Sequence, residues 1–440
     1  MHISPFFLIL VLCLVVTCHN PCPGASCIAL LSDLEGNQTR FERFLALHPA
    51  FESKPDGKRH LRSDAVFVFG GDAPDRFFGE RHVLRELLRL KQETPDRVIL
   101  IAGNRDVNKL RLPLELSAAG MATGPHTGKP EYQNWCRKQN RDDIPASRLR
   151  WMLEQTMGSP LAFELRREEL AREQHQIVTD IDEEAVVASY LEDSRPGGLF
   201  HQYLKAACLM ARQGPTLFVH AGIPQASLGH IPGSTTREGT VDFWAAQLNT
   251  WMQRQIELWE IGFETWNGSL PRPGEDLIRY AERWGGQSAN PFSVLYGRTM
   301  DDDGKVTLPP PPVIQWLHAS GIRRLVVGHT PSGQIPVVQR TADGNFEFLV
   351  LDTSYGLADE PPLVTIGGLD GSLTAFSCPI DLPGTGRTIL EFTLQLGTPG
   401  PLGRRTEDGA ILVAPVADGW LSYQLEPGYK VRYNVRSSPR

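Results

Sequence analysis

Short apolar runs that stop abruptly at polar residues are the clearest pattern along the chain. Residues 28–31, 65–69 and 97–101 are each dominated by apolar, often β-branched side chains, and Gly, Asp or Asn follows each run within three residues. Runs of this length and composition are typical of buried strands. Between the second and third runs, leucines in residues 80–93 recur at helical spacing. This alternation predicts an α/β domain whose functional site lies at the carboxyl ends of its strands.

Two later apolar runs lead directly into histidine. Residues 216–219 are followed by His220, and residues 324–327 are followed by Gly328 and His329. A single histidine after a strand is more often a core or surface residue than a ligand. Two histidines that both follow strands, together with the polar ends of the earlier strands, point to a shared site at the carboxyl ends of the strands.

The remaining patterns suggest how the domain is organised. Residues 113–213 are charged and amphipathic, which predicts a helical insertion or cap. After residue 356 the pattern changes to strands and turns. We therefore expect a main domain over residues 26–383 and a β-rich C-terminal extension over residues 384–440.

The N-terminus resembles a targeting segment. Residues 6–18 are apolar apart from Thr17, which is too short for a membrane span and suits the core of a signal peptide. Against this, no Lys or Arg precedes Phe6. We expect residues 1–25 to be a signal peptide or short anchor, and the protein to be secreted, periplasmic or in the lumen of the secretory pathway. A buried first strand is the alternative.

Composition narrows the function classes. The chain has 440 residues, 41% of them hydrophobic and 22% charged, with a formal net charge of −7. These values indicate a globular protein and give no sign of a nucleic-acid partner. The seven cysteines form neither a disulfide framework nor a CxxC metal motif.

The strand ends carry chemistry that suits divalent cations. They offer three carboxylates, one amide and two imidazoles: Asp33, Glu35, Asp72, Asn104, His220 and His329. One Asp after a strand is usually a turn or a helix cap. The complete set, in order along the chain, fits two divalent cations that share one bridging carboxylate.

The same segments resemble a known family. Residues 71–76 are Gly-Asp-Ala-Pro-Asp-Arg, residues 219–222 are Val-His-Ala-Gly, and residues 328–331 are Gly-His-Thr-Pro. These blocks are similar to the calcineurin-like metallophosphoesterases, most closely the phosphoprotein phosphatase and diadenosine tetraphosphatase branch. The resemblance covers roughly residues 28–352 in five blocks. It implies two facing mixed β-sheets flanked by helices, with the helical insertion left unmatched.

The resemblance also implies roles for individual residues. Asp33 would bind a first metal, Asp72 would bridge both metals, and the second metal would be held by Asn104, His220 and His329. Arg76 and Arg298 would bind phosphate, for which a guanidinium fork is well shaped. Asp352 matches a family position near the site, although a turn explains it equally well.

Two positions depart from the family pattern. Glu35 stands where the family has His, which would make the first site all oxygen and favour Mn²⁺ or Mg²⁺ over Zn²⁺ or iron. The alternative is that Glu35 faces solvent and the first metal binds weakly. Arg105 stands where the family has a proton-donating His that pairs with the residue equivalent to Asp75. An Arg cannot act as a general acid near neutral pH, but it can pair with Asp75 and stabilise phosphoryl charge.

The function expected from the resemblance is a two-metal phosphoesterase. It would hydrolyse a phosphate monoester or phosphoanhydride by attack of a metal-bound hydroxide. Its substrate would be a nucleoside polyphosphate, a small phosphate ester or a phosphoprotein. The alternative is a catalytically degenerate member that binds a phosphorylated ligand or partner without hydrolysing it.

Overall fold

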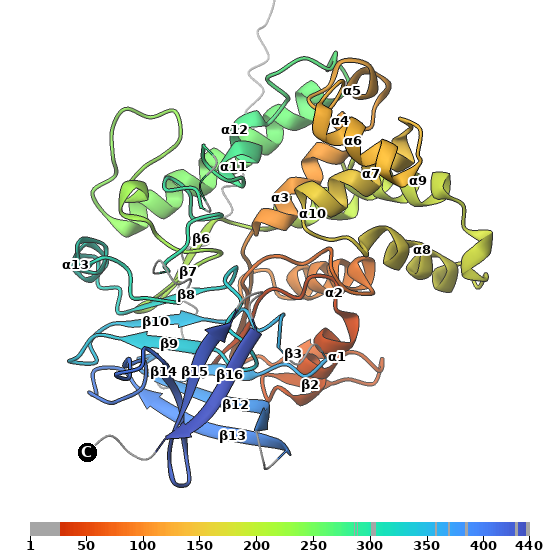
Figure 1. Cartoon of the computed structure of the whole chain (residues 1–440). Coiled ribbons are helices and arrows are strands. Elements are labelled where there is room, and N and C mark those ends of the chain that lie inside the picture. Colours follow the sequence, from red (N-terminus) through yellow and green to blue (C-terminus); the bar gives the residue numbers. More distant parts are fainter. Residues whose placement is uncertain are drawn as a thin grey trace, which may run out of the picture.

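The computed structural model describes residues 27–436 with gaps at 286, 288, 301–304, 357–358, 368–369, 383–385 and 427–429. The expected signal peptide, residues 1–25, lies outside the described residues. Two mixed sheets and a set of helices make up most of the described chain (Figure 1).

The larger sheet contains the first three predicted strands. Its order is β13-β12-β11-β1-β4-β5, and β1, β4 and β5 run parallel to one another. The other three pair in antiparallel fashion on the far side of β1. The bounds are Cys27–Leu31 for β1, Ala65–Phe69 for β4, Val98–Leu100 for β5, Leu363–Gly367 for β11, Leu373–Leu382 for β12 and Gly386–Gln395 for β13.

The second sheet contains the two strands that lead to histidine. Its order is β6-β7-β8-β10-β9, with β7, β8 and β10 parallel. The bounds are Met210–Gln213 for β6, Thr216–Val219 for β7, Arg324–Val327 for β8, Val337–Arg340 for β9 and Glu347–Val350 for β10. The two sheets meet where Ile101 and Cys208 form an isolated parallel bridge. Buried side chains from both sheets belong to one hydrophobic core.

Helices cover the sheets and form the predicted insertion. α1 packs against β4, where the rings of Phe44 and Phe67 are in contact, and α2 packs against β5 and spans Glu80–Glu93, as predicted. Between β5 and β6 the chain is helical until Ala206, and the end of the predicted insertion instead forms strand β6. The other bounds are Gln38–Leu47 for α1, Asn104–Asn108 for α3, Leu112–Glu115 for α4, Ala118–Thr123 for α5, Pro130–Gln139 for α6, Pro145–Trp151 for α7, Ala162–Glu173 for α8, Glu183–Ser194 for α9, Leu199–Ala206 for α10, Val241–Phe263 for α11, Glu275–Tyr280 for α12 and Pro311–Ala319 for α13.

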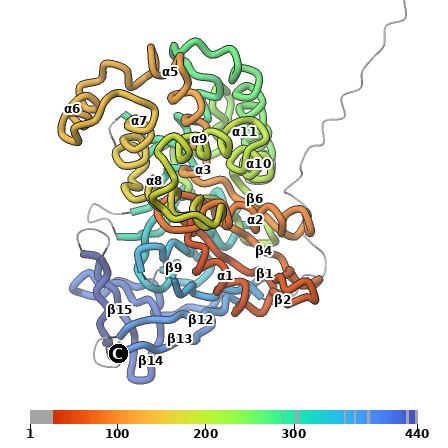
Figure 2. Tube along the Cα trace, turned by 90° about the vertical axis from the view of Figure 1, so that its right-hand side faces the viewer, coloured from red at the N-terminus to blue at the C-terminus, as the bar shows by residue number. Residues whose placement is uncertain are grey.

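The C-terminal region is β-rich, as expected. Its last three strands form a separate sheet that lies beside β9, β12 and β13 (Figures 1 and 2). β13, however, pairs with β12 over ten residues, so the larger sheet continues past residue 383. The division of the chain into a main domain and a C-terminal extension at residue 383 stays a prediction. The remaining strands are β2 at Phe51–Ser53, β3 at Arg59–Leu61, β14 at Ile411–Val416, β15 at Gly419–Glu426 and β16 at Lys430–Arg436.

The mixed α/β architecture with a helical insertion agrees with the predicted fold class. Among the described residues, none of the helices combines the length and apolar character needed to cross a bilayer.

Candidate active site

The polar strand ends converge at the junction of the two sheets. The loops after β1 and β4 run side by side, because the backbone N–H of Asp33 donates to Gly71 O at 3.0 Å and that of Glu35 donates to Asp72 O at 2.9 Å. The loop after β8 joins them, since the backbone N–H of His329 donates to the Asp33 carboxylate at 3.0 and 3.1 Å. Main-chain hydrogen bonds therefore fix the relative positions of the side chains.

The backbone is strained where the site side chains leave it. Five site residues have left-handed backbone conformations, with φ between 47° and 114°: Asp33, Glu35, Asp72, Asp75 and His329. Such conformations cost on the order of 1–3 kcal/mol each and are concentrated at functional sites. The surrounding hydrogen bonds hold these residues in place and aim their side chains.

Two glycines allow the loops to approach one another. A Cβ at Gly103 would lie 2.2 Å from Asp72 Oδ1, and a Cβ at Gly328 would lie 2.1 Å from Asp33 Oδ2. Any larger residue at either position would displace a site carboxylate. The requirement for glycine here comes from space rather than from φ.

The histidine side of the cluster fits a divalent cation. His220 Nε2 lies 3.3 Å from Asp72 Oδ1 and 3.1 Å from Asn104 Oδ1. Potential ligand atoms of Asp72, His220 and His329 all lie within 4.8 Å of one another. His220 Nδ1 is bonded to Gly70 O at 2.8 Å, which orients the ring as metal-binding imidazoles usually are oriented. A mixed set of imidazole and oxygen donors suits Zn²⁺, Mn²⁺ or iron.

The carboxylate side of the cluster is arranged differently. Glu35 Oε2 lies 2.7 Å from Arg76 Nη1, and Glu35 Oε1 lies 2.9 Å from Arg105 Nε. Both oxygens of the expected first-metal ligand therefore form ion pairs with guanidinium groups. Asp33 and Asp72 could still contribute oxygen atoms to a second cation, but Glu35 fits that role less well than His220 fits the other.

Burial and the crowding of carboxylates shift the pKa values of several residues in the cluster. Burial and the nearby Asp352 raise the pKa of Asp33 well above its usual value. Burial also raises the pKa of Glu35 to about 6, although Arg105 and Arg76 act to lower it. Burial lowers the pKa of His220, but Asp72 and Asp33 outweigh this and raise it to about 10. Bound cations would offset the same excess of negative charge.

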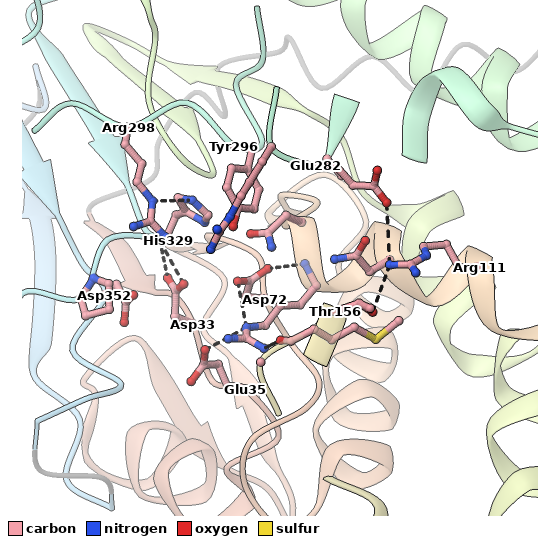
Figure 3. A pocket seen from close by; sticks show the side chains of 18 of the residues that line it. Asp33, Glu35, Asp72, Arg111, Thr156, Glu282, Tyr296, Arg298, His329 and Asp352 are labelled. Atoms are coloured by element: carbon pink, nitrogen blue, oxygen red, sulfur yellow. Dashed lines mark hydrogen bonds and ion pairs between the residues drawn. The ribbon is translucent and has the colours of Figure 1, made fainter. Parts of the chain in front are cut away.

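A cavity of about 660 Å³ opens over the cluster. Asp33, Glu35, Asp72, His329 and Asp352 lie on one side of it, and Arg111 and Glu282 lie opposite (Figure 3). The expected phosphate-binding Arg298 lines the cavity and donates from Nε to His329 Nε2 at 3.1 Å. Arg105, Arg111 and Arg283 also line it, so four guanidinium groups reach the same space as the candidate metal ligands.

Three of the predicted site residues do not line the cavity: Asp75, Arg76 and the fully buried His220. Arg76 lines a neighbouring groove, where its guanidinium lies 3.7 Å from the centre of the Tyr355 ring. Asp75 is buried and pairs with Arg105 at 3.3 Å, as expected, and also with Lys109 at 2.5 Å. The phosphate-binding role of Arg76 and the pairing role of Asp75 in catalysis stay predictions. Arg76 is linked to the cavity by its ion pair with Glu35, which lines it.

Several important residues were not predicted. Lys109 is fully buried beside Asp75. It follows Arg105 by four positions, a spacing that places both on one helical face and could have revealed it. Asp106 accepts hydrogen bonds from the backbone N–H groups of Asp72 at 3.0 Å and Gly103 at 2.7 Å. Its place three residues after Gly103 was a helix-capping signal.

Solved structures similar to this chain include phosphatases. The cold-active protein-tyrosine phosphatase of the psychrophile Shewanella sp. is 15% identical, with 83% of this chain and 80% of that chain covered and a TM-score of 0.41. A protein serine/threonine phosphatase from Saccharomyces cerevisiae is 14% identical, with 86% and 82% covered and a TM-score of 0.33. A structure assigned as a diadenosine tetraphosphatase is 14% identical, with 85% and 96% covered and a TM-score of 0.28.

No protein-family model matches the chain, and no curated protein matches it by sequence. The structural similarities are low, so the interpretation of the site rests on its own geometry.

Proposed function

We propose that this chain is a metal-dependent phosphoesterase that hydrolyses a phosphate monoester or phosphoanhydride. The observation that carries the proposal is the convergence of Asp72, His220 and His329, with ligand atoms within 4.8 Å of one another, beneath a cavity that Arg105 and Arg298 also line. Cation ligands and phosphate-binding groups in one cavity are the parts that phosphoryl transfer requires.

Divalent ions bound here would polarise the phosphate and lower the pKa of water. Asp72, Asn104, His220 and His329 would hold one ion, and Asp33 with Asp72 would contribute to a second. Mn²⁺ is the expected ion, with Mg²⁺, iron and Zn²⁺ as alternatives. The number and identity of the ions are part of the proposal.

Arg105 would stabilise charge on the transferring phosphoryl group. Its guanidinium lies between Glu35 and Asp75, and its Nη1 also donates to Met157 O and Ser159 Oγ, each at 2.9 Å. Burial lowers the pKa of Arg105, but Glu35, Asp75 and Asp72 outweigh this and hold it above its usual value. A group fixed and charged in this way supplies electrostatic stabilisation without reorganisation, but it cannot deliver a proton to a leaving group.

A second candidate is a protein that binds a phosphorylated ligand without hydrolysis. The pairing of both Glu35 oxygens with Arg76 and Arg105 favours it, because Glu35 is then not available to bind the first metal. The intact histidine side of the cluster favours the enzyme. Export from the cytoplasm stays a separate proposal that neither function depends on.

The test is metal content and turnover of the purified chain. We expect one to about two tightly bound divalent ions per chain and Mn²⁺-stimulated release of phosphate from aryl phosphates or nucleoside polyphosphates. Chelation should abolish that release, and added Mn²⁺ should restore it. Turnover that persists after complete metal removal would contradict the proposal. Bound metal and bound phosphate without turnover would favour the second candidate.

A further inference from the structure

A groove of about 530 Å³ leads away from the cavity and shares Gly158 and Tyr355 with it. One wall is formed by Phe77 and Phe78, which directly follow Arg76. The segment from Gly158 to Leu161, which leads into α8, forms another part of the lining. The volume lies within the range of about 300–1,000 Å³ that is typical of small-molecule sites.

Both parts of the lining are held by the residues that surround Glu35. The backbone N–H of Phe77 donates to Glu35 O at 2.8 Å, which fixes the aromatic wall to the loop after β1. Arg105 Nη1 donates to Met157 O and Ser159 Oγ, each at 2.9 Å, which fixes the segment that contains Gly158 and Ser159. The groove is therefore a preformed space that adjoins the cavity.

The chemistry of the groove suits a flat apolar group. Phe77 and Phe78 are half-buried, with the guanidinium of Arg172 4.0 Å from the centre of the Phe78 ring, and Leu161 is 63% exposed. The groove therefore presents apolar surface from Leu161 and from the parts of the two phenyl rings that remain uncovered. Tyr355 adds a further ring, one face of which is covered by the Arg76 guanidinium. Aromatic side chains of this kind bind other rings by stacking and edge contacts.

The same groove does not suit a second phosphate. Arg76 is the one basic residue among the described residues that line it, and its charge is paired with Glu35 at 2.7 Å. The carboxylate of Asp359 lies at the groove and would repel an anion.

We propose that this groove binds an aromatic ring of the substrate while the attached phosphate occupies the metal cavity. The inference rests on the proposed phosphoesterase function and adds a substrate class, phosphate esters that carry an aryl group or a nucleobase. Residues 77, 78 and 161 would then select for the ring without taking part in the chemistry.

The test separates ring binding from leaving-group reactivity. Benzyl phosphate and ethyl phosphate both release an alkyl alcohol, so a difference in kcat/KM between them reports the ring. We expect benzyl phosphate to be preferred by about tenfold to a hundredfold, the value of burying one aromatic side chain. Adenosine 5′-monophosphate against ribose 5-phosphate is the corresponding pair for a nucleobase.

Leu161→Asp should remove the preference by placing a carboxylate on the wall of the groove, and it should leave ethyl phosphate turnover within about twofold of wild type. Leu47→Asp is the matched control, because Leu47 is also 63% exposed but does not line the groove. The inference is supported if the enzyme prefers the ring-bearing substrate in either of the two substrate pairs, if Leu161→Asp removes that preference, and if Leu47→Asp keeps it. No preference in either pair, or one that survives Leu161→Asp, overturns it.

Binding of non-hydrolysable analogues keeps this result distinct from failure of the proposed function. If the chain hydrolyses neither ester with any divalent ion, the phosphoesterase proposal fails. Calorimetry with benzylphosphonate and ethylphosphonate then decides the inference alone. Tighter binding of benzylphosphonate that Leu161→Asp abolishes supports the groove as a ring-binding site, and equal affinity of the two compounds overturns it.

Discussion

The two sides of the candidate metal cluster differ in what their ligands already contact. On the histidine side, His220 Nε2 faces Asp72 and Asn104 at 3.1–3.3 Å, and His220 is oriented by Gly70 O. On the carboxylate side, both Glu35 oxygens are paired with arginines. On the histidine side a guanidinium contacts one expected ligand atom, His329 Nε2, whereas on the carboxylate side both oxygens of Glu35 are paired with guanidinium groups. A cation therefore meets less competition on the first side than on the second. We therefore expect unequal affinities for two ions.

The largest effect should come from the residue that both sides share. Asp72→Asn neutralises the expected bridging carboxylate while keeping its size, so it should lower activity by at least about a thousandfold and remove most bound metal. Metal analysis and kcat on an aryl phosphate check this. Asp343→Asn is a control for loss of one carboxylate charge, because Asp343 is exposed, lies in a turn and does not line the cavity. Near wild-type turnover and metal content in Asp72→Asn would contradict the assignment of both sides.

One variant from each side tests whether the two sides of the cluster bind metal with different affinities. His220→Asn can keep a donor near Gly70 O but removes Nε2, so we expect affinity for the tighter ion to fall by at least about a hundredfold. Glu35→Gln should leave that ion in place and weaken only the second. Titration of the metal-free protein with Mn²⁺ measures both. Equal losses of the tighter ion in the two variants would remove the distinction between the sides.

The sequence predicted which polar side chains gather at the strand ends far better than it predicted the contacts around them, and their role as metal ligands stays a prediction. Asp33, Asp72, Asn104, His220 and His329 could be found because each follows a short apolar run, and parallel strands bring such positions to one edge. The ion pairs of Glu35 could not be found, because they depend on how two loops cross.

The same limit applies to the helical insertion. Its existence followed from amphipathic spacing, but the position of Met157 and Ser159 against Arg105 depends on tertiary packing across more than fifty residues. Local spacing carries no information on contacts at that separation. The groove beside Tyr355 remained unseen for the same reason.

The carboxylate side should also set the preference among leaving groups. Because Arg105 cannot donate a proton, phosphoanhydrides and aryl phosphates should be cleaved faster than phosphoserine peptides, for which loss of general-acid help costs about a hundredfold or more. Arg105→His should narrow this gap, since Asp75 is positioned to orient a new imidazole, although Lys109 also binds Asp75 at 2.5 Å. Values of kcat/KM on one substrate of each kind provide the measurement. A wild-type preference for phosphoserine would show that another group supplies the proton.

The smallest effect should be a change in metal preference when the carboxylate side is made more like the histidine side. With oxygen donors from Asp33, Glu35 and Asp72, Mn²⁺ should activate the metal-free protein better than Zn²⁺. Glu35→His should shift this preference toward Zn²⁺ or iron, by less than about tenfold because the histidine side is unchanged. Histidine tolerates the left-handed backbone at this position, where φ is 47°, better than most residues do. Glu35→Gln is the matched control, since it also loses the ionic pairing with Arg76 and Arg105 but gains no imidazole. If both variants respond to Mn²⁺ and Zn²⁺ as wild type does, residue 35 does not bind metal, and its function is to hold the two arginines.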